Sequence, residues 1–286
     1  MKIRDILKQD KVTLSFEVFP PKKADGLEKV LAAAEEIAAL HPDFMSVTYG
    51  AAGSTSKLTV QVADTIRKKY GVPVLPHFTC VSSTRDRVRE MLREIKTAGI
   101  ENIMALRGDI PQDGTVEHDY RHAVDLIRDI REQSDLCIGA ACYPEGHIEC
   151  PHKADDLRYL KEKVSAGADF LTTQMFFDNG LFYNFLYRAR EAGIYVPVIP
   201  GIMPITAARQ LGRSVALSGT NVPARFRAIV DHYGEDPAAM KQAGIIYAAE
   251  QIIDLIANGV RHIHVYSMNK PDVAAAILRN LEGVLN

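Results

Sequence analysis

The sequence of 286 residues lacks several features that mark particular classes of protein. No run approaches the ~18 consecutive apolar residues of a membrane-spanning helix. The charged start, MKIRDILKQDK, has no apolar core of the kind found in signal peptides. Lysine and arginine number 34 against 36 acidic residues, and the net charge of −2 predicts no general affinity for nucleic acid or for an anionic membrane. We therefore expect a cytoplasmic protein with neither type of partner.

Cysteines and familiar catalytic motifs are also scarce. The four cysteines, too few and too scattered for a disulfide scaffold, are Cys80, Cys137, Cys142 and Cys150. The last two form a C-x4-H-x2-C-x-H pattern with His147 and His152, but this spacing matches no standard zinc site, and we expect no metal. There is no G-x-S-x-G, Walker, H-E-x-x-H or C-x-x-C motif. No lysine lies in or at the tip of an expected strand, apart from Lys270 in the final loop, which argues against a Schiff-base aldolase.

What the sequence does contain is a strict alternation of short apolar runs and helix-like segments. The apolar runs predict eight strands, at residues 14–19, 44–48, 72–80, 103–106, 136–143, 170–176, 196–202 and 262–266. The helices predicted between and after them lie at residues 27–40, 57–70, 84–98, 120–133, 153–166, 180–192, 205–217, 223–232, 237–258 and 271–285. Such alternation implies a parallel sheet with right-handed crossovers.

Eight strand–helix units predict an α/β protein with a (β/α)8 TIM barrel fold, a single domain over residues 1–286. The main alternative is an open doubly wound sheet, which favours a glycine-rich phosphate loop after the first strand. The sequence there is FEVFPPKK and has no such loop. The segments TAGIEN, SAGADF, EAGIYV and ANGVRH each place a glycine between a helix and the next strand, as expected of a left-handed C-cap.

The active site of such a barrel lies at the carboxyl ends of its strands. The predicted ends carry, in chain order, Glu17, Thr48-Tyr49, His77, Arg107-Gly108-Asp109, Tyr143, Gln174, Pro200-Gly201 and Tyr266. A structural barrel can have one or two polar residues at these places. Because most of these ends are ionisable or can form hydrogen bonds, we expect them to converge on one pocket.

Glu17 and Asp109 are the candidate catalytic residues. Strand alternation points either Glu17 or its neighbours Phe16 and Val18 into the barrel. An inward Glu17 among apolar groups would have a raised pKa and suit a general acid, whereas an outward one would pair with a helix cation. Asp109 lies beside Arg107 and close to solvent, where it would stay ionised and stabilise positive charge. The alternative is a solvated Arg–Asp pair on an ordinary loop.

Other polar residues suit a large, partly flat ligand. Tyr143 and His147 flank the tripeptide PEG and predict a loop that stacks on such a ligand and hydrogen-bonds to it. Asp156 and Lys163 are seven residues apart, so two helical turns place them on one side, either as a solvated face or against a polar ligand tail. His77, in PHFTC, is either a ligand contact or a satisfied core histidine.

Together these segments resemble the methylenetetrahydrofolate reductase family, flavin-dependent barrel enzymes. The matching segments, each at a strand end and in the family order, are SFEVFPPK (15–22), SVTYGA (46–51), PHFTC (76–80), NIMALRGDIP (102–111), AACYPEGH (140–147), TQMFFDN (173–179), IPGIMPI (199–205) and HVYSMN (264–269). The segments resemble the bacterial type of this family, which has the catalytic barrel alone. It implies reduction of 5,10-methylenetetrahydrofolate to 5-methyltetrahydrofolate through bound FAD, in a ping-pong cycle with NADH or NADPH as electron donor.

The resemblance also implies residue roles. Glu17 matches the family's acid, which helps form the reactive 5-iminium cation, and Asp109 matches the aspartate that stabilises this cation and tunes the flavin. Three positions, Gln174, Gln210 and Lys270, match substrate-binding residues. The positions implied for FAD are Thr48, His77, Arg107, Gly108, Asp109, His122, Ala123, Tyr143, His147, Asp156 and Lys163. Arg107 and Lys163 are the natural partners of its phosphates.

Five positions depart from the family pattern. His122 replaces a frequent tyrosine, and Tyr159 and Glu162 replace polar or basic residues near the adenosine half of FAD. Ser214 stands in place of an aromatic residue and Lys270 in place of an arginine. These departures leave the reaction in place and make a partner protein an alternative electron donor. The family commonly self-associates, which implies a homo-oligomer.

Two rival interpretations remain open. One is a pterin-binding methyltransferase barrel, which needs no flavin. The other is a folate- or flavin-binding barrel without catalysis, against which the presence of both Glu17 and Asp109 argues.

Overall fold

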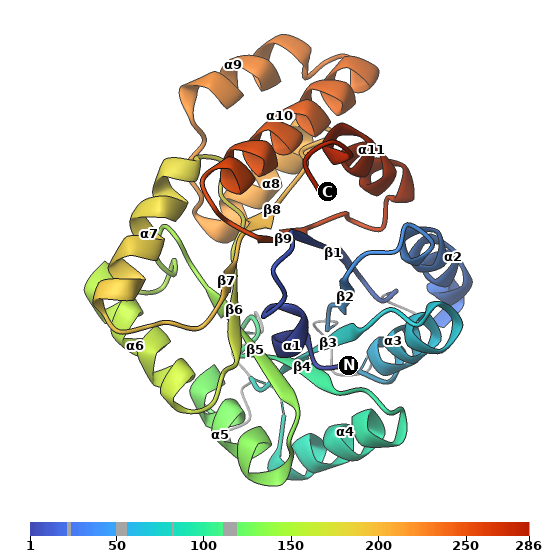
Figure 1. The fold of residues 1–286 in the computed structure, drawn as a ribbon, viewed down its shortest axis with the longest axis vertical. Helices are drawn as coiled ribbons and strands as arrows, with labels where there is room; N and C mark the ends of the chain where they lie inside the picture. The colour runs from blue at the N-terminus through green and yellow to red at the C-terminus, as the bar shows by residue number, and fades with distance from the viewer. Residues whose placement is uncertain (22–23, 50–55, 82, 111–118, 286) are drawn as a thin grey trace.

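The computed structural model describes residues 1–21, 24–49, 56–81, 83–110 and 119–285, and its strands form a ring enclosed by helices (Figure 1). The strands in these ranges are β1 Thr13–Val18, β2 Phe44–Val47, β3 Val74–Thr79, β4 Asn102–Leu106, β5 Cys137–Cys142, β6 Phe170–Thr173, β7 Val198–Ile199, β8 Gly201–Ile202 and β9 His262–Val265. Their order is β7-β6-β5-β4-β3-β2-β1-β9-β8, and each pair is parallel.

The ring closes because β7 and β8 are two halves of one strand. Pro200 separates them and has no N–H for a ladder hydrogen bond. β7 pairs with β6, and β8 pairs with β9. The predicted strand at residues 196–202 is therefore interrupted, and the eight positions of a (β/α)8 barrel are filled. The predicted TIM barrel is confirmed.

Helices follow the strands around the outside (Figure 1). They are α2 Leu27–Ala38, α3 Ser56–Tyr70, α4 Arg85–Thr97, α5 Ala123–Gln133, α6 Lys153–Ser165, α7 Asn179–Glu191, α8 Ala208–Ser218, α9 Ala224–Tyr233, α10 Pro237–Ala257 and α11 Pro271–Leu281, with a 3-10 turn η1 at Ala24–Gly26. The glycines of the four predicted closers, Gly99, Gly167, Gly193 and Gly259, all have positive φ, which confirms their role between helix and strand.

Strand alternation separates two layers of side chains. On β1, Phe16 and Val18 are buried in the core between the sheet and residues of α2 such as Ile37. Ser15 and Glu17 alternate with them and face the inside of the barrel. Fully burying such an aromatic or branched side chain contributes roughly 1.5–3 kcal/mol. This outer core therefore fixes the direction in which the polar residues point.

A short helix at the start of the chain, α1 (Ile3–Ile6), lies in the middle of the ring (Figure 1). The sequence pattern does not predict it. Ile3 and Ile6 pack with residues at the amino ends of the strands, including Phe44, Leu75 and Phe170. The interior is thus filled with apolar groups at its amino end, and space for a ligand remains at the carboxyl end.

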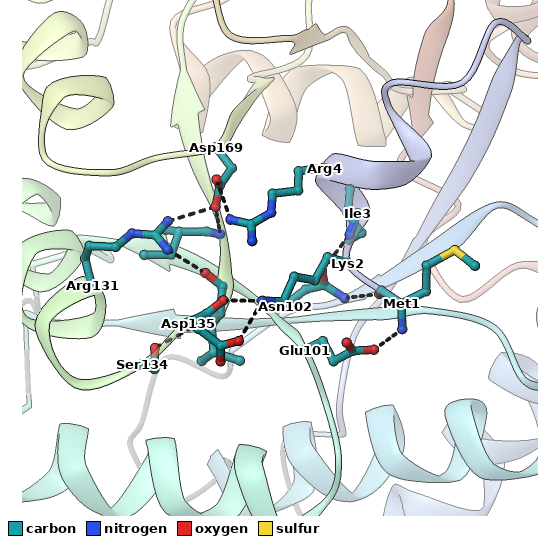
Figure 2. A network of polar contacts seen from close by, with 12 residues as sticks. Met1, Lys2, Ile3, Arg4, Glu101, Asn102, Arg131, Ser134, Asp135 and Asp169 are labelled. Atoms are coloured by element: carbon teal, nitrogen blue, oxygen red, sulfur yellow. Dashed lines mark hydrogen bonds and ion pairs between the residues drawn. The ribbon is translucent and has the colours of Figure 1, made fainter.

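Polar contacts hold α1 in place (Figure 2). The side chain of Asn102 accepts from the backbone N–H of Ile3 at 2.7 Å. Asp169 accepts from Arg4 at 3.1 Å and from Arg131 at 2.8 Å, so one carboxylate joins α1 to β6 and α5. In the ranges that the structure describes, no helix is long and apolar enough to cross a membrane.

Candidate functional site

A cavity of about 440 Å³, here called the central cavity, opens at the carboxyl ends of the strands. The predicted site residues that line it are Glu17, Thr48, His77, Arg107, Gly108, Asp109, Tyr143, His147 and Gln174. The expected convergence of strand ends on one pocket is confirmed except at Pro200-Gly201, which does not line the cavity. Side chains at the ends of β1, β3, β4, β5 and β6 all reach it.

A second cavity, also about 440 Å³ and here called the side cavity, adjoins the first. Arg107, Tyr143 and His147 line both cavities. The side cavity lies against the first residues of α5 and against α6, and its other predicted site residues are His122, Ala123, Asp156 and Lys163. Every position implied for FAD by the resemblance therefore lines one or both cavities.

Glu17 points into the central cavity, so the inward orientation, one of the two that the sequence allowed, is correct. Its Oε2 accepts a hydrogen bond from Ser46 at 3.2 Å. The same oxygen lies 3.6 Å from Nε2 of His77 and 3.8 Å from Nε2 of His264. The ring of His264 is held in turn by Ser15, whose hydroxyl lies 2.8 Å from Nδ1. Glu17 is thus the centre of a buried polar cluster.

The expectation of a raised pKa for Glu17 is wrong in direction. Burial raises the pKa, but the nearby imidazoles of His264 and His77 and the Ser46 hydroxyl together lower it below its usual range. The sequence places apolar neighbours beside Glu17 on its own strand, whereas its spatial neighbours come from β2, β3 and β9. Burial also lowers the pKa of His77 to about 4, although Glu17 acts to raise it.

His264 is a site residue that the sequence analysis missed. It is buried, lines the central cavity and stands two residues before Tyr266, which lines the same cavity. Alternation along β9 therefore places both rings on the inner face. The sequence analysis named only Tyr266 at the end of the last strand. The same alternation, applied two residues earlier, would have predicted that His264 also faces the cavity.

Arg107 lines both cavities and forms part of the wall between them, whereas Gly108 lines the central cavity. The guanidinium of Arg107 does not make the simple surface pair with Asp109. It forms a bidentate pair with Glu149, with Nη1 and Nη2 at 2.6 and 2.7 Å from the two carboxylate oxygens. Glu149 is a second residue that the sequence analysis did not identify. Asp109 is exposed at the edge of the central cavity.

Gly108 is required by its conformation and by the space around it. Its φ is +88°, and a Cβ added there would lie 2.8 Å from Cβ of Thr79. We expect Gly108→Ala to lower the free energy of unfolding by about 1–2 kcal/mol, because a left-handed residue and a close contact are both unfavourable. Urea unfolding would measure this. Gly212→Ala is the matched control, since an added Cβ there meets nothing within 4 Å. Equal stability of the two variants would contradict this account.

Tyr143 and His147 lie edge to face, with ring centroids 4.6 Å apart. Burial raises the pKa of Tyr143 to about 12, so its hydroxyl remains protonated near neutral pH. Burial likewise lowers the pKa of His147. These two rings provide neutral hydrogen-bonding groups and an aromatic surface at the junction of the cavities.

Asp156 and Lys163 face the side cavity from one side of α6, so the prediction from their spacing is confirmed. The Lys163 ammonium donates to the carbonyl of Ala141 at 2.8 Å. Burial lowers the pKa of Lys163 and raises that of Asp156, and each charge partly offsets this effect on the other. A cation with one backbone partner in a cavity is suited to an anionic ligand.

The three predicted substrate-binding residues lie in two different regions of the barrel. Gln174 lines the central cavity, where its Oε1 accepts from the backbone N–H of Met175 at 2.9 Å. Gln210 and Lys270 instead meet at Thr206: Lys270 donates to the threonine hydroxyl at 2.6 Å, and the hydroxyl lies 3.3 Å from Oε1 of Gln210. Neither belongs to the residues that line the two cavities.

The four cysteines are free thiols, and Cys142 is buried. In the described part of the chain, no group of three or more His, Cys, Asp or Glu side chains is arranged to hold a metal ion.

A (β/α)8 barrel with ionisable strand ends around one cavity is the architecture of a barrel enzyme. A profile of the family named Methylenetetrahydrofolate reductase matches residues 2–282. The chain is 34% identical over 273 residues to 5,10-methylenetetrahydrofolate reductase of Pectobacterium carotovorum subsp. carotovorum, covering 96% of this chain and 91% of that protein. It is 36% identical over 295 residues to Methylenetetrahydrofolate reductase (NADH) 1 of Arabidopsis thaliana. The chain therefore belongs to the methylenetetrahydrofolate reductase family, a family of oxidoreductases.

The lengths of these relatives differ. The alignment with the Arabidopsis protein covers 98% of this chain but 50% of that protein, so the chain spans about half the length of this plant relative. One similar solved structure is that of an uncharacterized protein from Clostridium thermocellum that binds two copies of 5-methyl-5,6,7,8-tetrahydrofolic acid. The TM-score is 0.66 and the sequence identity 18%, and the match covers 98% of this chain and 97% of that chain. Dihydropteroate synthase from Stenotrophomonas maltophilia matches with a TM-score of 0.53, 14% identity, and 97% and 95% covered. These two structures support the fold alone.

Proposed function

We propose that this protein reduces 5,10-methylenetetrahydrofolate to 5-methyltetrahydrofolate through bound FAD, with NADH or NADPH as electron donor in a ping-pong cycle. The observation that carries the proposal is the position of Glu17 and Asp109 in one cavity, beside a second cavity lined by Arg107 and Lys163. Family membership supplies the reaction class. We place the protein in the cytoplasm and propose that it acts as a homo-oligomer.

The two adjoining cavities suit a long ligand such as FAD. The central cavity has room and hydrogen-bonding walls for a flat ring system, and the cationic groups of Arg107 and Lys163 are suited to a diphosphate. Gly108 lets the backbone approach a ligand closely, because its positive φ and its crowded surroundings leave no room for a side chain. FAD, when bound, relays a hydride from the nicotinamide to the methylene carbon of the folate.

Glu17 is proposed to deliver the proton that opens the folate ring to the iminium cation. Its lowered pKa keeps Glu17 ionised near neutral pH in the ligand-free site, so the carboxylate must take up a proton before it can act as the acid. The exposed carboxylate of Asp109 then stabilises the cation, as the family resemblance implies.

Substrate contacts are assigned to two regions. Gln174, in the central cavity, is proposed to hydrogen-bond the pterin. Lys270 and Gln210, joined through Thr206, are proposed to hold the distal part of the folate. The lysine can attract a carboxylate as a point charge but cannot bind it with the bidentate geometry of an arginine.

The first experiment is the visible absorption spectrum of the purified protein, recorded anaerobically before and after addition of NADH. We expect a flavin spectrum that bleaches with NADH and returns when methylenetetrahydrofolate is added, because the two half-reactions use the same flavin. A flavin that ignores both NADH and NADPH but is reoxidised by folate after chemical reduction would indicate a protein electron donor. No flavin after addition of FAD would overturn the proposal and favour a flavin-independent methyltransferase.

A further inference from the structure

The guanidinium of Arg107 is held from two directions at the wall between the cavities. Besides its bidentate pair with Glu149, at 2.6 and 2.7 Å, its Nε donates to the carbonyl of Gly108 at 3.2 Å. These contacts use three of the five N–H groups of the side chain and leave two for a ligand. Arg107 is therefore oriented by Glu149 without being fully occupied by it.

Glu149 also acts on a second residue of the same wall. Its backbone N–H lies 3.1 Å from Nδ1 of His147 and donates to it. A neutral imidazole that accepts at Nδ1 carries its proton at Nε2, so this contact makes the other ring nitrogen a donor. The ring is further fixed by its edge-to-face contact with Tyr143. The carboxylate of Glu149 thus orients Arg107, and its backbone N–H orients His147; both of these donors line the two cavities.

We propose that Glu149 is a positioning residue for the phosphate groups of the bound nucleotide, taken here as FAD, because its carboxylate fixes Arg107 before the ligand arrives. The inference rests on the proposed function for the identity of that nucleotide. Glu149 itself lines the side cavity, and its carboxylate acts on the ligand through Arg107.

Glu149 has two opposing effects on the binding of a phosphate group. Its negative charge repels a phosphate, but the side chain is 51% exposed, so water and salt screen this repulsion. Its hydrogen bonds hold a long, flexible arginine in one conformation, and a free arginine would lose that freedom only on binding. We expect the ordering effect to exceed the screened repulsion. Removal of the carboxylate is therefore expected to weaken phosphate binding.

The test is a flavin-fluorescence titration of protein from which bound flavin has been removed, using FAD, FMN and riboflavin. Glu149→Ala is expected to raise the Kd for FAD and FMN about tenfold, equivalent to 1.4 kcal/mol. Riboflavin, which has no phosphate, is expected to bind as it does to the wild type. A general disturbance of the fold would weaken all three ligands alike.

Glu250→Ala is the matched control. Glu250 forms the same bidentate pair, with Arg225 at 2.8 and 2.6 Å, and is also 51% exposed, but it lies on α10 and does not line either cavity. We expect this variant to bind all three flavins like the wild type. The comparison separates loss of an exposed ion pair from loss of the pair that orients Arg107.

A double-mutant cycle tests whether Glu149 acts through Arg107. Arg107→Ala combined with Glu149→Ala is expected to weaken FAD binding little more than Arg107→Ala alone, because the carboxylate then has no guanidinium to orient. Unchanged or tighter FAD binding by Glu149→Ala, or an equal loss for riboflavin, would overturn the inference while the proposed function stands. A wild-type protein that binds no FAD would overturn the proposed function itself.

Discussion

Replacement of Glu17 by glutamine is expected to slow the reduction of methylenetetrahydrofolate by about 100-fold or more, the usual contribution of a general acid. Glutamine has nearly the same shape and can still accept from Ser46, but it cannot release a proton. Reduction of the flavin by NADH is expected to proceed at the wild-type rate, because that half-reaction does not open the folate ring. Stopped-flow spectroscopy would measure the two half-reactions separately.

Glu145→Gln provides the control for that experiment. Glu145 is a half-buried carboxylate in the loop after β5, and it accepts from the backbone N–H of Asn221 at 3.0 and 3.2 Å. It does not line either cavity, so both half-reactions are expected to continue at wild-type rates. Unchanged folate turnover in Glu17→Gln would refute the assignment of Glu17 as the acid.

The barrel and most of the cavity lining could be predicted from the sequence, because both follow from local patterns. A strand needs only a short apolar run, and strict alternation of strands and helices leaves few topologies. Once the strands are placed, their carboxyl ends must meet. That reasoning predicts Glu17, His77 and Arg107 at one cavity, and all three line it.

The features that could not be predicted depend on partners distant in the sequence. α1 has four residues, too few to show a helical period, and it is stabilised by strands that follow much later. Arg107 and its partner Glu149 are 42 residues apart. The direction of the Glu17 pKa shift depends on His264, which is far along the chain. Local apolar neighbours predicted an apolar environment, and tertiary structure supplied a polar one.

Acidification is expected to destabilise the protein through His77. A histidine in an unfolded chain has a pKa near 6.5, whereas burial lowers that of folded His77 to about 4, with Glu17 opposing and His264 adding to the shift. Between these values the unfolded state binds more protons, so stability rises with pH. The contribution is fully present above pH 6.5 and is lost as the pH falls toward 4, by about 3 kcal/mol in total. Urea unfolding at pH 7.5 and pH 4.5 would measure most of this loss.

His77→Gln is expected to lose about 2–3 kcal/mol less stability than the wild type between those two pH values, since glutamine does not titrate. His152→Gln is the control: His152 is exposed, and its replacement should leave the full loss in place. A loss in His77→Gln equal to that of the wild type would show that folded His77 titrates near its usual pKa. The result also bears on the proposed chemistry. Because folded His77 is neutral near pH 7, it is not the source of the proton that the proposed reaction needs.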